Sequence, residues 1–169
     1  MNIHSEGKYF LFLILSFVGY MGNAQSDKDF VLQVNGEVLR PLKLNLPDLS
    51  NFRQEEIRAK DRDNREHVFS GVLLGTILDS AGVTLGQELR GENLAKYILC
   101  RAVDGYEVVF SLPEADTSFS GRQILVAIKV DGAFLPKGEG PFRIIVPDDK
   151  RHSRWMRELS SIRILYPKE

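Results

Sequence analysis

Basic side chains that could bind a phosphate group are concentrated near the end of the chain. The stretch between positions 143 and 157 contains Arg143, Lys150, Arg151, His152, Arg154 and Arg157. A guanidinium group can donate two parallel hydrogen bonds to phosphate oxygens, so such a cluster can form an anion site. The charge pattern alone also fits a solvated surface neutralised by the neighbouring Asp148, Asp149 and Glu158.

Patterns typical of hydrolases, metalloenzymes and nucleotide-binding proteins are missing from the sequence. There is no G-x-S-x-G, no H-E-x-x-H and no glycine-rich phosphate loop. His67 and His152 lie far apart in sequence and belong to no metal-ligand spacing. We therefore predict neither a catalytic residue nor a metal ligand.

The single cysteine, Cys100, lies in the apolar segment YILCRA. A free cysteine usually packs as a small hydrophobic residue, so we expect a buried structural thiol. A reactive thiolate would need a nearby positive charge, and Arg101 points to the opposite face of the predicted strand.

Composition excludes several classes of protein. The 169 residues include 22 Lys and Arg against 23 Asp and Glu, for a net charge of -1, which argues against a nucleic-acid-binding protein. One cysteine cannot build a disulfide framework or a four-thiolate zinc site. The 43% hydrophobic content is too high for a disordered chain.

The N-terminus has the layout of a secretory signal peptide. An apolar run from Tyr9 to Tyr20 is followed by Gly22 and Ala24 at the positions of a small-residue cleavage site. The run is shorter than the roughly 20 residues that a membrane-spanning helix needs. We expect residues 1–24 to be a signal peptide, residues 28–169 to form the domain, and the protein to be periplasmic or secreted, with no membrane span after cleavage.

The remaining chain predicts mostly strands. Four hairpins are expected where turn residues separate apolar segments: at Asn35-Gly36, Asp61–Arg65, Asp104-Gly105 and Asp131-Gly132. Further strands are expected at 42–46, 142–146 and 161–166. Helical spacing predicts a helix over Leu73–Ala81 that ends at Gly82, one helical turn from Pro47, and a short helix over 151–159, with a polar loop at 84–95. The expected fold class is a single α+β domain with a mainly antiparallel or mixed sheet and a few short helices.

Five short blocks occur in a fixed order along the chain: Phe69–Leu74 with Ala81–Val83, Asp104–Tyr106 with Ser111-Leu112, Asp131-Gly132 with Leu135-Pro136, Gly140–Pro147, and Arg151–Trp155. They are similar to the blocks W-x-G-V-P-L, D-G-Y, N-G-x-x-L-P, G-x-P-x-R-x-x-x-P and R-H-x-K-W. From about Val34 to Ile164 the chain thus resembles the molybdopterin-binding domain of the sulfite oxidase family.

This resemblance implies a fold, a cofactor and candidate site residues. In the family the R-H-x-K-W region helps to hold the phosphate of the pterin, and the matching residues are Arg151, His152 and Arg154. Arg143 matches a family arginine and is added to the candidate cofactor-binding residues. The family's enzymes also place a molybdenum-ligating cysteine upstream of the G-V-P-L block, but the corresponding stretch Ile57–Asn64 holds none.

The resulting hypothesis is an exported, non-catalytic molybdopterin-binding-like domain that binds a phosphate-bearing pterin or another small anion. Molybdopterin is implied by resemblance only, and the missing thiolate argues against molybdenum. Two alternatives remain open. One is a molybdopterin-dependent oxidoreductase that works without the cysteine, and the other is a structural or protein-interaction domain with no ligand.

Overall fold

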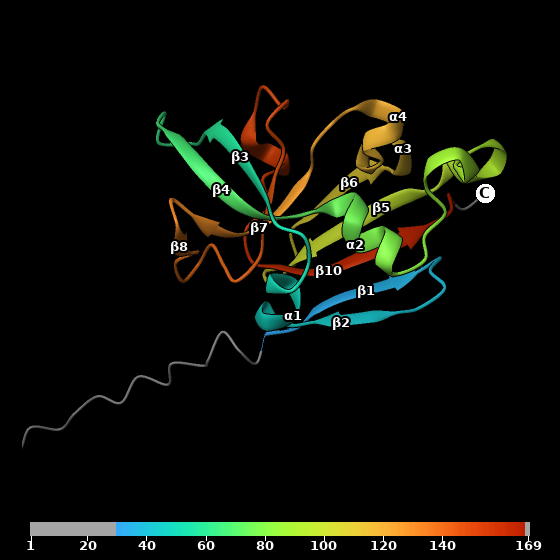
Figure 1. Cartoon of the computed structure of the whole chain (residues 1–169), viewed down its shortest axis with the longest axis horizontal. Coiled ribbons are helices and arrows are strands. Elements are labelled where there is room, and N and C mark those ends of the chain that lie inside the picture. The colour runs from blue at the N-terminus through green and yellow to red at the C-terminus, as the bar shows by residue number, and fades with distance from the viewer. Residues whose placement is uncertain (1–29, 168–169) are drawn as a thin grey trace, which may run out of the picture.

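Two five-stranded sheets contribute to one apolar core (Figure 1). The computed structural model describes residues 30–167, so the expected signal peptide at 1–24 lies outside the described residues. No helix in this part of the chain is long and apolar enough to cross a bilayer.

The first sheet, sheet A, has the strand order β2-β1-β10-β5-β6. Its strands are β1 (Leu32–Gly36), β2 (Leu42–Leu44), β5 (Tyr97–Ala102), β6 (Glu107–Ser111) and β10 (Leu159–Leu165). The central pair of β1 and β10 is parallel, and every other pair in sheet A is antiparallel.

The second sheet, sheet B, has the order β3-β4-β7-β8, with β9 also paired to β7. Its strands are β3 (Glu55–Lys60), β4 (Glu66–Leu73), β7 (Leu125–Val130), β8 (Ala133–Phe134) and β9 (Arg143–Ile145). All pairs in sheet B are antiparallel, and β8 and β9 occupy successive lengths of the same edge of β7. The mixed, mainly antiparallel α+β fold predicted from the sequence is confirmed.

Short helices fill the connections between strands. They are α1 (Leu46–Ser50), α2 (Leu74–Ser80), α3 (Leu112–Ala115) and α4 (Thr117–Ser120), with 3₁₀ turns η2 (Gly86–Glu88), η3 (Gly91–Ala95) and η4 (His152–Arg154). The predicted helix over 73–81 is confirmed as α2, and Gly82 after it has the positive φ of +72° that a helix C-terminus favours. The polar loop expected at 84–95 is wound into η2 and η3.

Three of the four predicted hairpins are confirmed, as β3–β4, β5–β6 and β7–β8. Asp131 and Gly132 both have positive φ, as their two-residue turn requires. The hairpin turn at Asn35-Gly36 was wrong, because both residues belong to β1, and β1 pairs with β2 instead. Gly36 is needed for another reason: a side chain there would collide with the backbone of Ile164 in β10.

The short helix expected over 151–159 was also wrong. Only the single 3₁₀ turn η4 forms, and β10 begins at Leu159. The backbone after η4 is drawn out of the helical conformation because Met156 accepts a hydrogen bond from the N–H of Ile144, and the N–H of Leu159 donates to Phe142. Arg151 and Arg154 therefore do not share a helix face.

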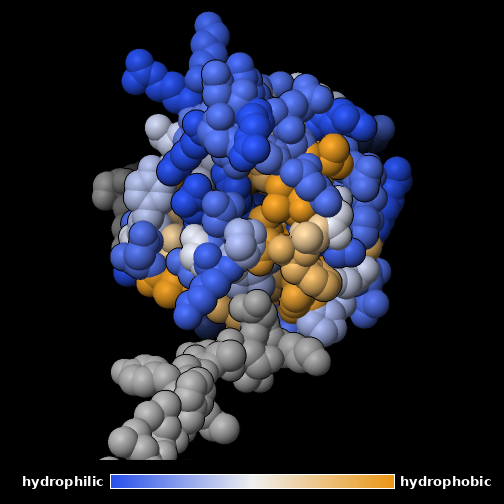
Figure 2. All heavy atoms as spheres, turned by 90° about the vertical axis from the view of Figure 1, so that its left-hand side faces the viewer, coloured by the Kyte–Doolittle hydropathy of each residue, from blue (hydrophilic) through white to orange (hydrophobic). Residues whose placement is uncertain are grey.

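Figure 2 shows the face on which the outer end of sheet B lies, at the left of Figure 1. Hydrophilic residues cover most of this face, and hydrophobic residues gather in a contiguous region to the right of its centre.

Candidate functional site: a groove beside the 152–155 turn

The η4 turn is held between the two sheets by side chains from both. His152 donates from Nε2 to the carbonyl of Lys60 (2.7 Å), and Arg62 donates to the carbonyl of His152 (3.3 Å). From sheet A, the hydroxyl of Tyr106 donates to the carbonyl of Ser153 (2.8 Å). Three strand connections that are distant in sequence thus meet at this turn.

Trp155 anchors the turn to the core. Its side chain is buried, and its indole N–H donates to the carbonyl of Val146 (2.8 Å). Its ring meets Phe69 edge-to-face at 5.8 Å and His152 in the same manner at 4.4 Å between centroids. Aromatic pairs of this geometry favour one arrangement, so the turn is held in a defined position.

Arg154, a predicted phosphate ligand, is already neutralised. Its guanidinium bonds both oxygens of Asp149 (2.8 and 2.6 Å) and one oxygen of Glu114 (3.1 Å). The Asp149 hydrogen bond is the main reason that the pKa of Arg154 is raised. Burial would raise the pKa of Glu114, but hydrogen bonds from Ser111 and Arg154 outweigh it and lower that pKa.

Arg143, the second predicted arginine, is almost fully buried, with 1% of its side chain exposed. It binds both oxygens of Asp61, each at 2.8 Å, and one oxygen of Glu139 at 2.8 Å. Burial would raise the pKa of Asp61, but the hydrogen bond from Arg143 is among the contacts that lower it. Two carboxylates therefore occupy the guanidinium edge that an incoming phosphate would need.

The other two predicted site residues have different positions. Arg151 is exposed at the start of η4, and within residues 30–167 it forms no ion pair. His152 has its Nε2 engaged with Lys60, as described above, so its contribution is to position the turn. The structure brings His152 and Arg154 onto one turn but directs Arg143 into the interior.

Beside this turn lies a hollow of about 430 Å³ whose polar lining consists of Arg62, Asp104, Tyr106, Ser153, Arg157 and Glu158. A second hollow, of about 240 Å³, shares Arg62 and Arg157 with the first and extends to Asp61, Asp63 and His67. We call the two together the Arg62–Arg157 groove. The larger hollow alone has a volume within the range typical of small-molecule sites.

Three residues of the groove were not predicted as site residues from the sequence: Arg62, Tyr106 and Arg157. Signals for them were nevertheless present. Arg157 belongs to the basic stretch, Tyr106 to the D-G-Y block, and Arg62 to the segment inspected for a cysteine. What was missing was their proximity, which depends on the packing of two sheets.

His67 joins the tips of two hairpins at the edge of the groove. Its Nδ1 lies 2.6 Å from Asp131 Oδ2, in the β7–β8 turn, and its Nε2 lies 3.0 Å from Asp63 Oδ2, in the β3–β4 turn. The hydrogen bonds with Asp131 and then Asp63 raise the pKa of His67. Asp63 also accepts from Arg65, and these contacts lower its pKa. His67 therefore bridges the segment that carries Arg62 to a neighbouring hairpin.

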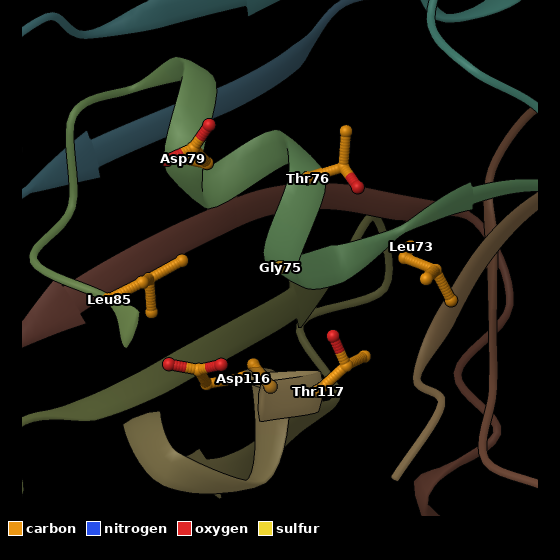
Figure 3. A pocket seen from close by; sticks show the side chains of 8 residues that line it. Leu73, Gly75, Thr76, Asp79, Leu85, Asp116 and Thr117 are labelled. Atoms are coloured by element: carbon orange, nitrogen blue, oxygen red, sulfur yellow. The ribbon is translucent and has the colours of Figure 1, made fainter. Parts of the chain in front are cut away.

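A third hollow, of about 260 Å³, lies between α2 and the α3–α4 junction (Figure 3). Thr76, Asp79, Asp116 and Thr117 line it. Asp116 uses both carboxylate oxygens internally, one for the N–H of Gly86 (2.6 Å) and the other for Ser118. No basic side chain lines it, so the phosphate chemistry suggested by the sequence is not available there.

Comparison with known proteins identifies the family. The model of the oxidoreductase molybdopterin binding domain matches residues 20–167. The chain belongs to this family. A comparison with curated protein sequences finds no match.

Solved structures support the same fold for this molybdopterin-binding domain. The crystal structure of the sulfane dehydrogenase SoxCD from Paracoccus pantotrophus is similar, with a TM-score of 0.66 and 20% sequence identity. The match covers 82% of this chain but only 39% of the SoxCD chain. The likeness is one of fold, and it involves less than half of the larger protein.

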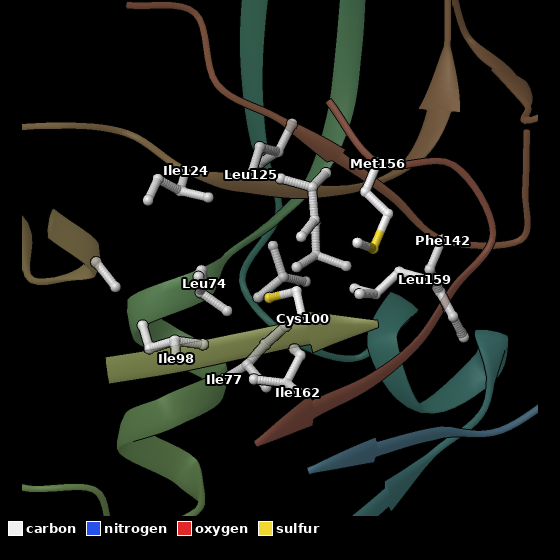
Figure 4. Packing of buried hydrophobic residues seen from close by; sticks show 14 of the residues in the cluster. Leu74, Ile77, Ile98, Cys100, Ile124, Leu125, Phe142, Met156, Leu159 and Ile162 are labelled. Atoms are coloured by element: carbon white, nitrogen blue, oxygen red, sulfur yellow. The ribbon is translucent and has the colours of Figure 1, made fainter. Parts of the chain in front are cut away.

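The residues present do not fit a molybdenum held by a cysteine thiolate. The single thiol, Cys100, is fully buried, and burial raises its pKa to about 12. Figure 4 shows its sulfur among apolar side chains, including Leu74, Ile77 and Leu159. Within residues 30–167, no group of three or more His, Cys, Asp or Glu side chains is arranged to hold a metal ion. The sequence interpretation of Cys100 as a buried structural thiol is confirmed.

The stretch in which the resemblance places the family cysteine includes the β3–β4 turn. Asp61 is at this turn, and its carboxylate is committed to Arg143. A partly buried carboxylate with a lowered pKa and a bidentate arginine partner is a hard oxygen donor that is already in use, so it does not replace a soft thiolate.

Proposed function

We propose that this chain is an exported member of the family that binds a phosphate-bearing pterin, or a related small anion, and catalyses no molybdenum-dependent redox reaction. The observation that carries the proposal is the Arg62–Arg157 groove, which two arginines line beside the 152–155 turn. This is the region in which the resemblance places pterin phosphate binding.

Both arginines retain capacity to bind an anion. Within the described residues Arg62 forms no ion pair, and the one hydrogen bond of its side chain goes to a neutral carbonyl. Arg157 contacts Glu139 (3.2 Å), and its buried Nε has no partner. Guanidinium groups with free donors bind phosphate oxygens strongly in a partly enclosed site. The proposal therefore assigns the anion to Arg62 and Arg157, with His152 positioning the turn and Arg151 at its exposed side.

The donor set supports the non-redox part of the proposal. A thiolate would have to come from Cys100, which lies in β5 within the apolar core. The reaction class of the family's enzymes is therefore not assigned to this chain. The residues lining the groove can bind and orient an anion, and none of them is a thiol.

Export rests on the N-terminal sequence described above, with cleavage after Ala24. N-terminal sequencing of the protein recovered from the periplasm or medium tests it. A mature chain that begins at Gln25 supports export, whereas a cytoplasmic protein that retains Met1 contradicts it.

A second candidate function is a protein-interaction domain with no small ligand. The neutralisation of Arg143 and Arg154 by carboxylates favours it, because two of the four predicted cofactor-binding residues already have structural partners. It differs from the first proposal in predicting that no pterin or phosphate raises the stability of the domain.

Metal analysis and pterin fluorescence after oxidation, on protein purified from its own compartment, test the proposal. Pterin without molybdenum supports it. Stoichiometric molybdenum with pterin overturns the non-redox part and favours an oxidoreductase that works without the cysteine.

If neither is found, thermal unfolding in the presence of a phosphorylated neopterin decides between binding and interaction domains. A ligand that binds only the folded state raises the melting temperature with its concentration. Arg62→Gln should remove that rise, and Arg58→Gln, on the exposed face of β3, should keep it. No rise in the unmodified protein contradicts the binding proposal and favours the interaction domain.

A further inference from the structure

The imidazole of His67, which lines the smaller hollow, lies between two carboxylates. Its Nδ1 is 2.6 Å from Asp131 Oδ2, and its Nε2 is 3.0 Å from Asp63 Oδ2. The backbone N–H of Arg65 lowers the pKa of Asp63, and the hydrogen bond with His67 lowers the pKa of Asp131, so both carboxylates are charged and only accept hydrogen bonds. Two hydrogen bonds from the ring at once therefore need an N–H on each nitrogen, which only the imidazolium form has.

The Asp131 end of this bridge is fixed by further contacts. The backbone N–H of Val68 donates to Asp131 Oδ1 (2.9 Å), and the N–H of Asp131 donates to the carbonyl of Val68 (2.8 Å). These bonds continue the pairing of β4 with β7 and do not involve the ring of His67. The β7–β8 turn therefore keeps its position in both charge states of His67.

The β3–β4 turn contains a short segment with anchored ends. Asp61, where the turn begins, binds Arg143 through both carboxylate oxygens, and its N–H donates to the carbonyl of Arg65 (2.9 Å). Between these anchors lie residues 62–64, which we call the flap. Because two of its residues line the smaller hollow, the position of the flap determines how open that hollow is.

Two side-chain contacts connect the flap to structure outside its own turn. Arg62 donates to the carbonyl of His152 over 3.3 Å, which is long for a hydrogen bond, and Asp63 contacts His67 over 3.0 Å. The other hydrogen bonds of the Asp63 carboxylate come from Arg65 in the same turn, so they do not tie the flap to β4. The His67 contact is the shorter of the two and joins two ionisable groups, so it contributes more to holding the flap in place.

We propose that the flap is a pH-operated lid on the smaller hollow, which protonated His67 holds closed through Asp63. When the ring loses one proton, the remaining N–H stays on Nδ1, at the shorter contact with Asp131, and the lone pair of Nε2 faces the carboxylate of Asp63. Two acceptors repel each other, so the flap is released and Arg62 moves with it. This device belongs to the fold itself and operates without a ligand in the groove, so it goes beyond the proposed function.

The other charged groups around His67 do not reverse this behaviour. The hydrogen bonds with Asp131 and then with Asp63 raise the pKa of His67. Across the hollow, arginines oppose the charge of the ring and further carboxylates pair with two of them: the residues are Arg62, Arg143, Arg157, Asp61 and Glu139. In the turn, Arg65 is paired with Asp63. The flap should therefore be closed below about pH 6.5 and open above the raised pKa.

Nuclear magnetic resonance on the unmodified protein, between about pH 5 and 9, tests the proposal. The ring nitrogen shifts of His67 report its protonation and tautomer, and order parameters of the Cα–Hα bonds in residues 62–64 report the motion of the flap. We expect order parameters of about 0.85 below the titration of His67 and below about 0.6 above it. Both changes should share one midpoint, and the neutral ring should carry its proton on Nδ1.

Two variants should lock the flap in opposite states. His67→Gln removes the charge, so the flap should be mobile throughout this pH range. Asp63→Asn provides an amide that accepts from the N–H of Arg65 and donates to neutral His67, so the flap should stay rigid throughout. Glu66→Gln, next to His67 in β4 and in an exposed ion pair with Arg58, is the matched control and should keep the unmodified profile. Circular dichroism verifies that each variant is folded.

Each outcome supports or overturns the proposal. Order parameters that follow the titration of His67, and that lose this dependence in both variants, support it. If the ring titrates while the flap stays rigid, His67 is a static surface contact and the proposal is wrong. A flap that is equally mobile at every pH, or a transition that persists in His67→Gln, also overturns it. None of these results depends on anion binding, which is tested separately.

Discussion

Arg143 and Asp61 are 82 residues apart in sequence, yet the guanidinium of one holds both carboxylate oxygens of the other at 2.8 Å. Phe69 and Trp155 lie within 5.4 and 5.9 Å of the same guanidinium, measured to their ring centroids. This pair ties the β3–β4 turn, which carries Arg62, to β9. An arginine that was predicted to bind a cofactor thus stabilises the edge of the groove instead.

Breaking this buried pair from one side should be costly. We expect Asp61→Asn to lower the free energy of unfolding by about 3 kcal/mol, because Arg143 keeps its charge in the interior with only Glu139 to balance it. Urea unfolding measures the change. Glu66→Gln, whose ion pair with Arg58 is exposed, is the control and should cost less than about 0.5 kcal/mol. Equal unfolding midpoints for the two variants would contradict a structural role.

The contacts of His67 with Asp63 and Asp131, which join two hairpins, should make the stability of the domain depend on pH. The pKa of His67 is raised from 6.5 in the folded state, so its contribution is complete below about 6.5 and is lost as the pH rises through the higher folded value. The pKa values of Asp63 and Asp131 are lowered from 3.8, so their contributions are present above that pH and are lost on acidification. We therefore expect maximal melting temperatures between about pH 4 and 6.5.

His67→Gln separates this effect from the titration of the rest of the protein. Its melting temperature should change less between pH 6 and 9 than that of the unmodified protein. An unchanged pH profile in the variant would show that the contacts with Asp63 and Asp131 do not contribute to stability.

Cys100 should be chemically silent in the folded protein. With a pKa of about 12, a negligible fraction is thiolate at neutral pH, and the apolar side chains around it exclude reagents. Labelling with a thiol-reactive dye should therefore be stoichiometric in 8 M urea (about the concentration that unfolds most domains) and absent in buffer. Rapid labelling of the native protein would contradict the position of Cys100 in the core.

Arg154 should stabilise the folded protein through its ion pairs with Asp149 and Glu114. We expect Arg154→Gln to lower the free energy of unfolding by about 1–2 kcal/mol, because Asp149 and Glu114 lose their partner in a half-buried site. Arg151→Gln, three residues earlier and exposed, is the matched control and should change stability by less than about 0.5 kcal/mol. Thermal and urea unfolding measure both. If both variants have the same stability, the Arg154 cluster is a solvated surface.

Local signals in the sequence were sufficient where an element is determined by its own residues. The turn at Asp131-Gly132 was predicted because both positions need positive φ, and both have it. The α2 helix followed from apolar spacing and Gly82. Asn35-Gly36 carries the same kind of signal but was misread, since Gly36 is required by the close approach of Ile164, which is distant in sequence.

The site could be predicted only in outline. The basic stretch located the turn, but the carboxylates that neutralise Arg143 and Arg154 come from other parts of the chain, at positions 61 and 114. Asp149 was close enough in sequence to be noticed as a neutralising charge. The groove itself requires the β3–β4 and β5–β6 turns to meet, and only packing of the two sheets determines that.

The position of β10 has a consequence for how the chain folds. This strand is the last in the described chain, yet it lies in the middle of sheet A, parallel to β1 and antiparallel to β5. A chain that has been synthesised only as far as residue 158 holds β1–β2 and β5–β6 as two separate ribbons, each with an unpaired edge. Closure of sheet A therefore waits until β10 has been synthesised, and it pairs β1 with a strand that is far from it in sequence. Such a topology slows folding because of the large loop to be closed.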